Sequence, residues 1–178
     1  AFVTAYPKIG VQLIEGTSSE LCRAVEEKRA DFCIISRREG EHDWLPLSDD
    51  PLVALVPCSH PLAKREVFSL SDFTTEAYID VYPTRETDNS RVFAKEGIHP
   101  HIRYSTADST AAASMVEAGL GIAILPQGAV EPYLDGGNFV AMTLDEPWAN
   151  RTLYLGFRDY RALPLIARHF VETLAPPL

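Results

Sequence analysis

Three polar segments of this chain place hydroxyl side chains where helices are expected to begin. They are Gly16–Ser19, Thr84–Asn89 and Thr106–Ser109, and each is expected to follow a strand. The first turn of a helix carries backbone N–H groups without helical partners, and the helix dipole favours negative charge there. Any one segment could be an ordinary helix cap. Three of them at one cleft would favour a binding site for an anion.

Arg37 directly follows the apolar run Phe32–Ser36, which is expected to be a strand, so its guanidinium could reach the same cleft. A guanidinium binds a carboxylate through two parallel hydrogen bonds. The neighbouring Arg38 keeps a second interpretation open, in which both are ordinary surface arginines. Asp88 and Asp108 would oppose a strongly anionic ligand unless one of them pairs with Arg37 or Arg85.

Motifs of common enzymes are absent from the sequence. There is no G-x-S-x-G, no G-x-x-x-x-G-K-[ST] and no H-E-x-x-H. Gly119-x-Gly121 follows an expected helix and precedes an expected strand, which is the reverse of the order in a dinucleotide-binding turn. His99 and His101 have no third ligand at a suitable spacing. We therefore predict no catalytic residue, no metal site and no cofactor.

The composition restricts the partners. A chain of 178 residues with 46% hydrophobic content can bury a core, as one domain or as two small lobes. Its net charge of −9 argues against a grip on a phosphate backbone. The three cysteines include no C-x-x-C pair, which favours a reducing cytoplasm over a disulfide scaffold. No apolar run approaches ~18 residues, so no membrane span is predicted.

The segment Ser105–Pro126 predicts a loop, a helix and a buried strand. Cap-type residues precede the run Ala111–Met115, and Gly119 is placed to end the helix in a left-handed conformation. The unbroken apolar run Gly121–Leu125 is typical of a strand covered on both faces. The segment is therefore predicted to form one helix–strand unit of an α/β core.

Elsewhere, Ile9–Glu15 is expected to be a strand, and Thr17 with Glu20 forms a capping box for a helix that runs to about Lys28. With the strand Phe32–Ser36 this predicts a parallel βαβ unit. Further strands are expected at Leu52–Val56, Tyr78–Tyr82, His101–Ser105 and Thr152–Arg158, and further helices at Ser90–Glu96, Gln127–Leu134 and from Pro164 onward. Alternating strands and helices predict α/β architecture.

Several short segments follow one another along the chain: Tyr6-Pro7 before VQLIEGTSSEL, then RADFCIISR, LPLSDDPLVALVPCSHPLA, SLSDF, EGIHP and MVEAGLGIAILP. In this order they resemble the effector-binding domain of LysR-type transcriptional regulators. The resemblance implies a two-lobed, type II periplasmic-binding-protein-like fold with a ligand cleft between the lobes. Lobe I would comprise residues 1–50 and 143–178, and lobe II residues 51–142. Because the chain begins at Ala1, without the family's helix-turn-helix, linker helix and first sensor strand, it resembles a trimmed sensor fragment.

The resemblance also implies a function. The chain would be a non-enzymatic, cytoplasmic sensor of a small anionic metabolite, and the absent helix-turn-helix would bind DNA. It would form homodimers, and tetramers in the full-length protein, with helices Ser18–Lys28 and Ser90–Glu96 as contact elements. A periplasmic or lipid-anchored solute-binding protein of a transporter is the alternative, and an enzyme on the same fold is a third option. The predicted effector contacts are Thr17, Ser18, Ser19, Arg37, Tyr82, Thr84, Asp88, Asn89, Thr106, Leu125 and Pro126.

Overall fold

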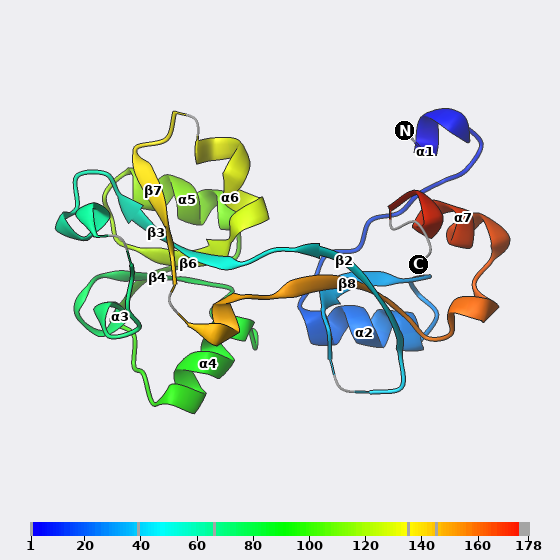
Figure 1. The fold of residues 1–178 in the computed structure, drawn as a ribbon, viewed down its shortest axis with the longest axis horizontal. Coiled ribbons are helices and arrows are strands. Elements are labelled where there is room, and N and C mark those ends of the chain that lie inside the picture. The colour runs from blue at the N-terminus through cyan, green and yellow to red at the C-terminus, as the bar shows by residue number, and fades with distance from the viewer. Residues whose placement is uncertain (1, 39, 66, 135, 145, 175–178) are drawn as a thin grey trace. The chain divides into compact units, whose positions relative to one another are not determined.

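A computed structural model describes residues 2–38, 40–65, 67–134, 136–144 and 146–174 of the chain. The chain divides into two compact units, unit 1 (Ala1–Asp49 and Thr152–Leu178) and unit 2 (Asp50–Arg151) (Figure 1). The sequence predicted a return to the first lobe at residue 143. The return instead lies at Arg151–Thr152, because β7 (Phe139–Thr143) still pairs with β3 (Leu52–Pro57) inside unit 2.

Unit 1 contains an antiparallel sheet in which β8 (Thr152–Phe157) lies between β1 (Cys33–Ser36) and β2 (Asp43–Asp49). The predicted parallel βαβ unit is wrong, since Ile9–Glu15 forms no strand. That segment has strand-type residues but no ladder partner among the described residues, and a lone strand is not stable in water. Strand β2 is not predicted from the sequence, because Pro46 and the acidic residues at both ends are unfavourable in strands.

The helices of unit 1 follow the sequence more closely. Helix α2 (Ser18–Glu26) begins at the predicted capping box, and Val25 packs against Cys33 and Ile35 of β1. Helix α7 (Leu165–Leu174) buries Val171 in a cluster with Leu155 and Phe157 of β8. The unit also contains α1 (Phe2–Ala5) and the 3-10 turn η3 (Tyr160–Ala162).

In unit 2, β3 lies between β6 (Ala123–Pro126) and β7 and is antiparallel to both. β4 (Tyr78–Val81) runs parallel to β5 (Ile102–Thr106). A parallel bridge between Tyr78 and Ile122 connects β4 to the residue before β6. The strands β5, β4 and β6 therefore run in one direction, so their carboxyl ends lie at the same edge.

Four helices and two 3-10 turns complete unit 2: α3 (Asp72–Thr75), α4 (Asp88–Glu96), α5 (Ser109–Glu117), α6 (Gln127–Leu134), η1 (Pro61–Lys64) and η2 (Pro147–Ala149). The predicted bounds of α6 are confirmed. The predicted end of α5 is also confirmed, because Gly119 has a φ of +75°. Among the described residues, no helix combines the length and apolar character needed to cross a bilayer.

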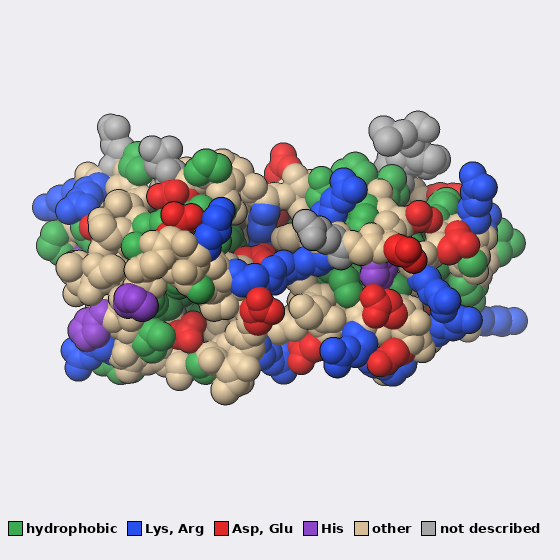
Figure 2. Space-filling model, turned by 90° about the horizontal axis from the view of Figure 1, so that it is seen from below, with side chains coloured by type: hydrophobic (Ala, Val, Ile, Leu, Met, Phe, Trp, Pro, Cys, Tyr) green, Lys and Arg blue, Asp and Glu red, His purple; other side chains and the backbone are tan. Residues whose placement is uncertain are grey.

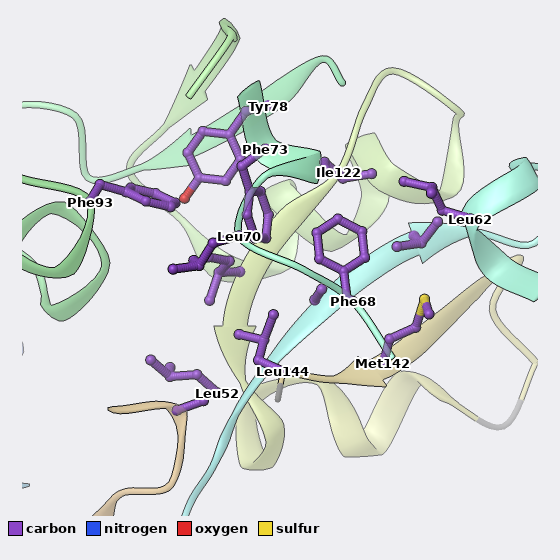
Figure 3. Packing of buried hydrophobic residues seen from close by; sticks show 14 residues of the cluster. Leu52, Leu62, Phe68, Leu70, Phe73, Tyr78, Phe93, Ile122, Met142 and Leu144 are labelled. Carbon is purple, nitrogen blue, oxygen red and sulfur yellow. The ribbon is translucent and has the colours of Figure 1, made fainter. Parts of the chain in front are cut away.

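The strand β3 explains the packing of unit 2, because all six of its residues are buried. Leu52, Ala54 and Val56 face one core cluster, and Val53 and Leu55 face another. Figure 3 shows the first cluster, in which the rings of Phe73, Tyr78 and Phe93 converge. Their centroids lie 5.5 to 5.6 Å apart in edge-to-face contacts. Both faces of the sheet are thus covered, as the continuous apolar run predicts.

Candidate functional site

The candidate site lies at the edge of the unit 2 sheet where β4, β5 and β6 end. Val81 pairs with Thr106, and the N–H of Tyr82 donates to the carbonyl oxygen of Thr106 over 2.8 Å. Pro126, the last residue of β6, pairs with Leu52 at the start of β3. In α/β sheets with parallel strands, ligands bind beyond the carboxyl ends of those strands. This edge is therefore where the unit would hold a ligand.

The start of α4 is held by two sets of contacts. Thr87 and Ser90 form a capping box, with the Ser90 N–H 3.1 Å from Thr87 Oγ1 and the Thr87 N–H 2.9 Å from Ser90 Oγ. The side-chain amide of Asn89 donates to the carbonyl oxygen of Ile124 in β6 over 3.2 Å. This contact fixes the first turn of α4 against the sheet. Thr84, in the preceding loop, is exposed.

Carboxylates of the chain already lie at the starts of α5 and α6. Asp108 Oδ1 accepts from the Ala111 N–H over 2.6 Å, and Thr106 Oγ1 accepts from the Asp108 N–H over 3.2 Å. At α6, Asp50 Oδ1 accepts from the Gly128 N–H over 3.0 Å. Both helix starts therefore already have a carboxylate partner, and that of α6 is itself paired with Arg151. Backbone N–H groups that the sequence analysis left for a ligand at these two helix starts are therefore partly used by the chain's own carboxylates.

The arginine partners of the site differ from those the sequence suggested. Asp88 Oδ2 lies 3.3 Å from Arg151 Nη1, and Asp88 Oδ1 lies 3.6 Å from Arg91 Nη2. Arg151 also pairs with Asp50, over 2.5 Å. Sequence reasoning missed Asp50 and Arg151, because no local pattern connects residues so far apart in the chain.

The end of β4 has an unusual backbone conformation at Tyr82 and a carboxyl group with a raised pKa at Asp80. Tyr82 has a φ of +63°, in the left-handed region that non-glycine residues rarely occupy. The guanidinium of Arg85 lies 5.6 Å from its ring centroid. Such strained positions cluster at functional sites. Burial raises the pKa of the Asp80 carboxyl, and a hydrogen bond from the Val81 backbone opposes this effect.

Two other predicted contacts of unit 2 differ in exposure. Leu125 is only 2% exposed and packs in the core with Val53 and Val130, so its side chain faces away from solvent. Pro126 is half-buried at the end of the strand. Of this turn, Pro126 is the residue that a ligand could contact through its side chain.

The remaining predicted contacts lie in unit 1. Thr17, Ser18 and Ser19 form the start of α2, where the Thr17 N–H donates to Glu20 Oε2 over 2.7 Å. Arg37 follows β1 and is exposed. Among the described residues no group of three or more His, Cys, Asp and Glu side chains could hold a metal ion.

The architecture is that of a type II periplasmic-binding-protein-like domain. The family model described as the LysR substrate binding domain matches residues 1–176, and the chain belongs to this family. It is 30% identical over 177 residues to the HTH-type transcriptional regulator YybE of Bacillus subtilis (strain 168), covering 97% of this chain and 59% of that protein. The chain spans about half the length of the curated relatives it matches, such as 54% of the Agrobacterium vitis regulator TtuA.

Solved structures show the same fold. The regulatory domain of Synechocystis PCC6803 CcmR, in complex with 2-PG, superposes with a TM-score of 0.84 at 22% identity, covering 97% of this chain and 85% of that one. The effector-binding domain of QuiR, in complex with shikimate, gives 0.75 at 23% identity, with 96% and 85% covered. The predicted family and fold are thus confirmed. The curated relatives are transcriptional regulators, so the transporter alternative is not favoured.

Proposed function

We propose that this chain is the sensor of a LysR-type DNA-binding regulator and that it binds a small metabolite without chemical conversion. The observation that carries the proposal is the shared edge of unit 2. There the loops after β4 and β5 and the starts of α4, α5 and α6 bring hydroxyl, amide and backbone groups together. Family membership supports this function, since the matching model describes a substrate-binding domain.

The ligand would meet two kinds of chemistry. At unit 2 it would meet Tyr82, Thr84, Asn89 and Thr106 beside the carboxylates that cap α5 and α6, which suits hydroxyl or amide groups on the ligand. Arg37 of unit 1 is the predicted partner of an anionic group. Thr17, Ser18 and Ser19 stay predicted contacts.

A thermal-shift screen tests the proposal. Small carboxylates, hydroxylated acids and aromatic acids would be added to the 178-residue chain. A ligand that binds only the folded state adds about 2.7 kcal/mol at one hundred times its dissociation constant. We expect a hit to lose this stabilisation in Asn89→Ala. Stabilisation that is equal in the parent and in this variant would place the ligand elsewhere.

The full-length protein would bind DNA through a helix-turn-helix outside this chain and would work as a homodimer or tetramer in the cytoplasm. The charge of −9 supports a separate DNA-binding part. Figure 2 shows acidic and basic side chains interspersed over the face it presents.

Helices α2 and α4 are the proposed dimer contacts. Sedimentation equilibrium of the chain would test this, with a dimer expected and a monomer at all concentrations counting against it.

A further inference from the structure

Asp50 and Arg151 are the unit 2 residues at the two points where the chain passes between the units. The Asp50 N–H donates to the Arg151 carbonyl oxygen over 3.0 Å, and Arg151 Nε donates to the Asp50 carbonyl oxygen over 2.8 Å. Arg151 Nη2 also donates to Asp50 Oδ2 over 2.5 Å. Three contacts therefore join the two connections through one pair of residues.

This pair is shielded from water. Of the residues that the structure describes, Asp50 is the only buried charged one, at 9% exposure. The Arg151 side chain is 18% exposed. A buried carboxylate is tolerated only when its lone pairs are matched by donors. Here Arg151 and the Gly128 N–H supply those donors, so the pair depends on the start of α6 as well as on the connections.

Arg151 forms a second ion pair, with Asp88 at the start of α4. Arg151 Nη1 lies 3.3 Å from Asp88 Oδ2, while the other oxygen of Asp88 faces Arg91 Nη2 at 3.6 Å. The Asp88 carboxylate is thus shared between an arginine at the connection and an arginine one turn along its own helix. It could strengthen either contact at the expense of the other. Asp88 is also in the loop and helix start proposed to contact the effector, so this part of the inference rests on the proposed function.

We propose that Asp50 and Arg151 form a clamp that restrains the two connections, and that Asp88 adjusts its strength according to the state of the α4 start. Arg151 is then a positioning residue and makes no contact with the ligand. The clamp gives a physical route by which a change at the edge of unit 2 reaches the connections. A coupling of this kind travels through contiguous contacts, and Asp88 connects the start of α4 to Arg151.

Amide hydrogen exchange, followed by NMR in the ligand-free chain, tests the clamp directly. In Arg151→Lys, which keeps the charge but loses the fork of donors, we expect the Asp50 amide to exchange about tenfold faster. Core amides of Leu55 and Ile79 should be unchanged, because the opening is local. In Asp88→Asn, which weakens the ion pair with Arg151 but leaves the contacts between Asp50 and Arg151 in place, the same amide should exchange faster by a smaller factor.

The matched control is Asp72→Asn, which removes the carboxylate of an ion pair with the exposed Arg65 at 3.0 Å in the same unit. It should leave the Asp50 amide unchanged. Equal exchange of this amide in the parent, Arg151→Lys and Asp88→Asn would overturn the proposal. Faster exchange of all core amides in these two variants would also overturn it, because that pattern would mean that Arg151 and Asp88 only stabilise the folded state as a whole. No ligand is used, so this outcome is independent of whether the proposed effector site exists.

Discussion

The backbone N–H of Tyr82 donates to the carbonyl oxygen of Thr106 over 2.8 Å, and both residues were predicted effector contacts. This bond extends the β4–β5 ladder by one residue beyond the last paired position, Val81 with Thr106. It holds the left-handed Tyr82 at the end of β4 and places the Thr106 hydroxyl near the start of α5. Two loops that are distant in the sequence thereby share one anchor.

Thr106→Val tests the polar contact that follows this anchor. The substitution keeps the shape of the side chain but removes Oγ1, which accepts from the Asp108 N–H. We expect a loss of about 0.5–1.5 kcal/mol in the free energy of unfolding. Chemical denaturation would measure it. Thr110→Val, on an exposed position of α5, is the control, and an equal loss there would show that the Thr106 contact has no special role.

Gly119 and Gly121 should resist substitution for different reasons. A side chain at Gly121 would overlap the backbone carbonyl of Ala77, so Gly121→Ala should cost about 1–3 kcal/mol through overpacking. Gly119 faces open space but has a φ of +75°, so Gly119→Val should cost at least about 1–2 kcal/mol through backbone strain.

The melting temperatures of these variants can be compared with that of Gly119→Asn, because asparagine tolerates the left-handed region better than valine does. We expect Gly119→Asn to lie between the parent and Gly119→Val. If Gly119→Val melted with the parent, the helix α5 would not end as the structure shows.

The Cys33 thiol should make unfolding easier at alkaline pH. Burial, and then the neighbouring Cys22, raises the pKa of Cys33 from 9.0 to about 12. The folded state therefore keeps the thiol protonated while the unfolded state releases its proton. The stability is fully present below the unfolded pKa and falls as pH rises above it, by about 1.4 kcal/mol between about pH 8 and about pH 10.

Urea denaturation of the parent and of Cys33→Ala over this range measures the effect. The variant lacks the titrating thiol, so its stability should depend less steeply on pH, although it is lower overall because a buried side chain is truncated. Parallel pH profiles for the two proteins would contradict the buried, protonated state of Cys33.

Arg37→Ala tests the predicted contact in unit 1. Loss of a charge-assisted hydrogen bond should weaken an anionic ligand by about 1.5–3 kcal/mol, with little effect on the melting temperature because Arg37 is exposed. Calorimetric titration of a hit from the screen would measure the loss. Arg158→Ala, another exposed arginine that follows a strand of unit 1, should bind like the parent. Unchanged binding in Arg37→Ala would remove Arg37 from the site.

The sequence predicts those elements whose signals are local. The capping box at Thr17, the bounds of α6 and the glycine that ends α5 depend on nearby residues only, and the structure confirms them. The predicted strand at Ile9–Glu15 is wrong because a strand needs a pairing partner, and the local sequence pattern does not show whether one is present. β2 was missed because its pairing with β8 compensates for a weak local preference.

The candidate site was only partly predictable for the same reason. The helix starts follow from cap residues, so Asn89 and Thr106 could be proposed from spacing. The pairing of Asp50 with Arg151 joins residues at opposite ends of unit 2, and burial of that carboxylate is a property of the folded chain. The carboxylate of Asp50 at the start of α6 could likewise not be predicted, because the contact joins residues 78 positions apart.

NMR chemical-shift mapping with a ligand found by the screen tests most directly whether the ligand binds at the shared strand edge of unit 2, because it locates binding residue by residue. We expect the largest shifts in unit 2 to fall on the loops and helix starts at 82–89, 106–109 and 126–128. Shifts confined to residues away from that edge of the sheet, such as the exposed side of α7, would contradict it.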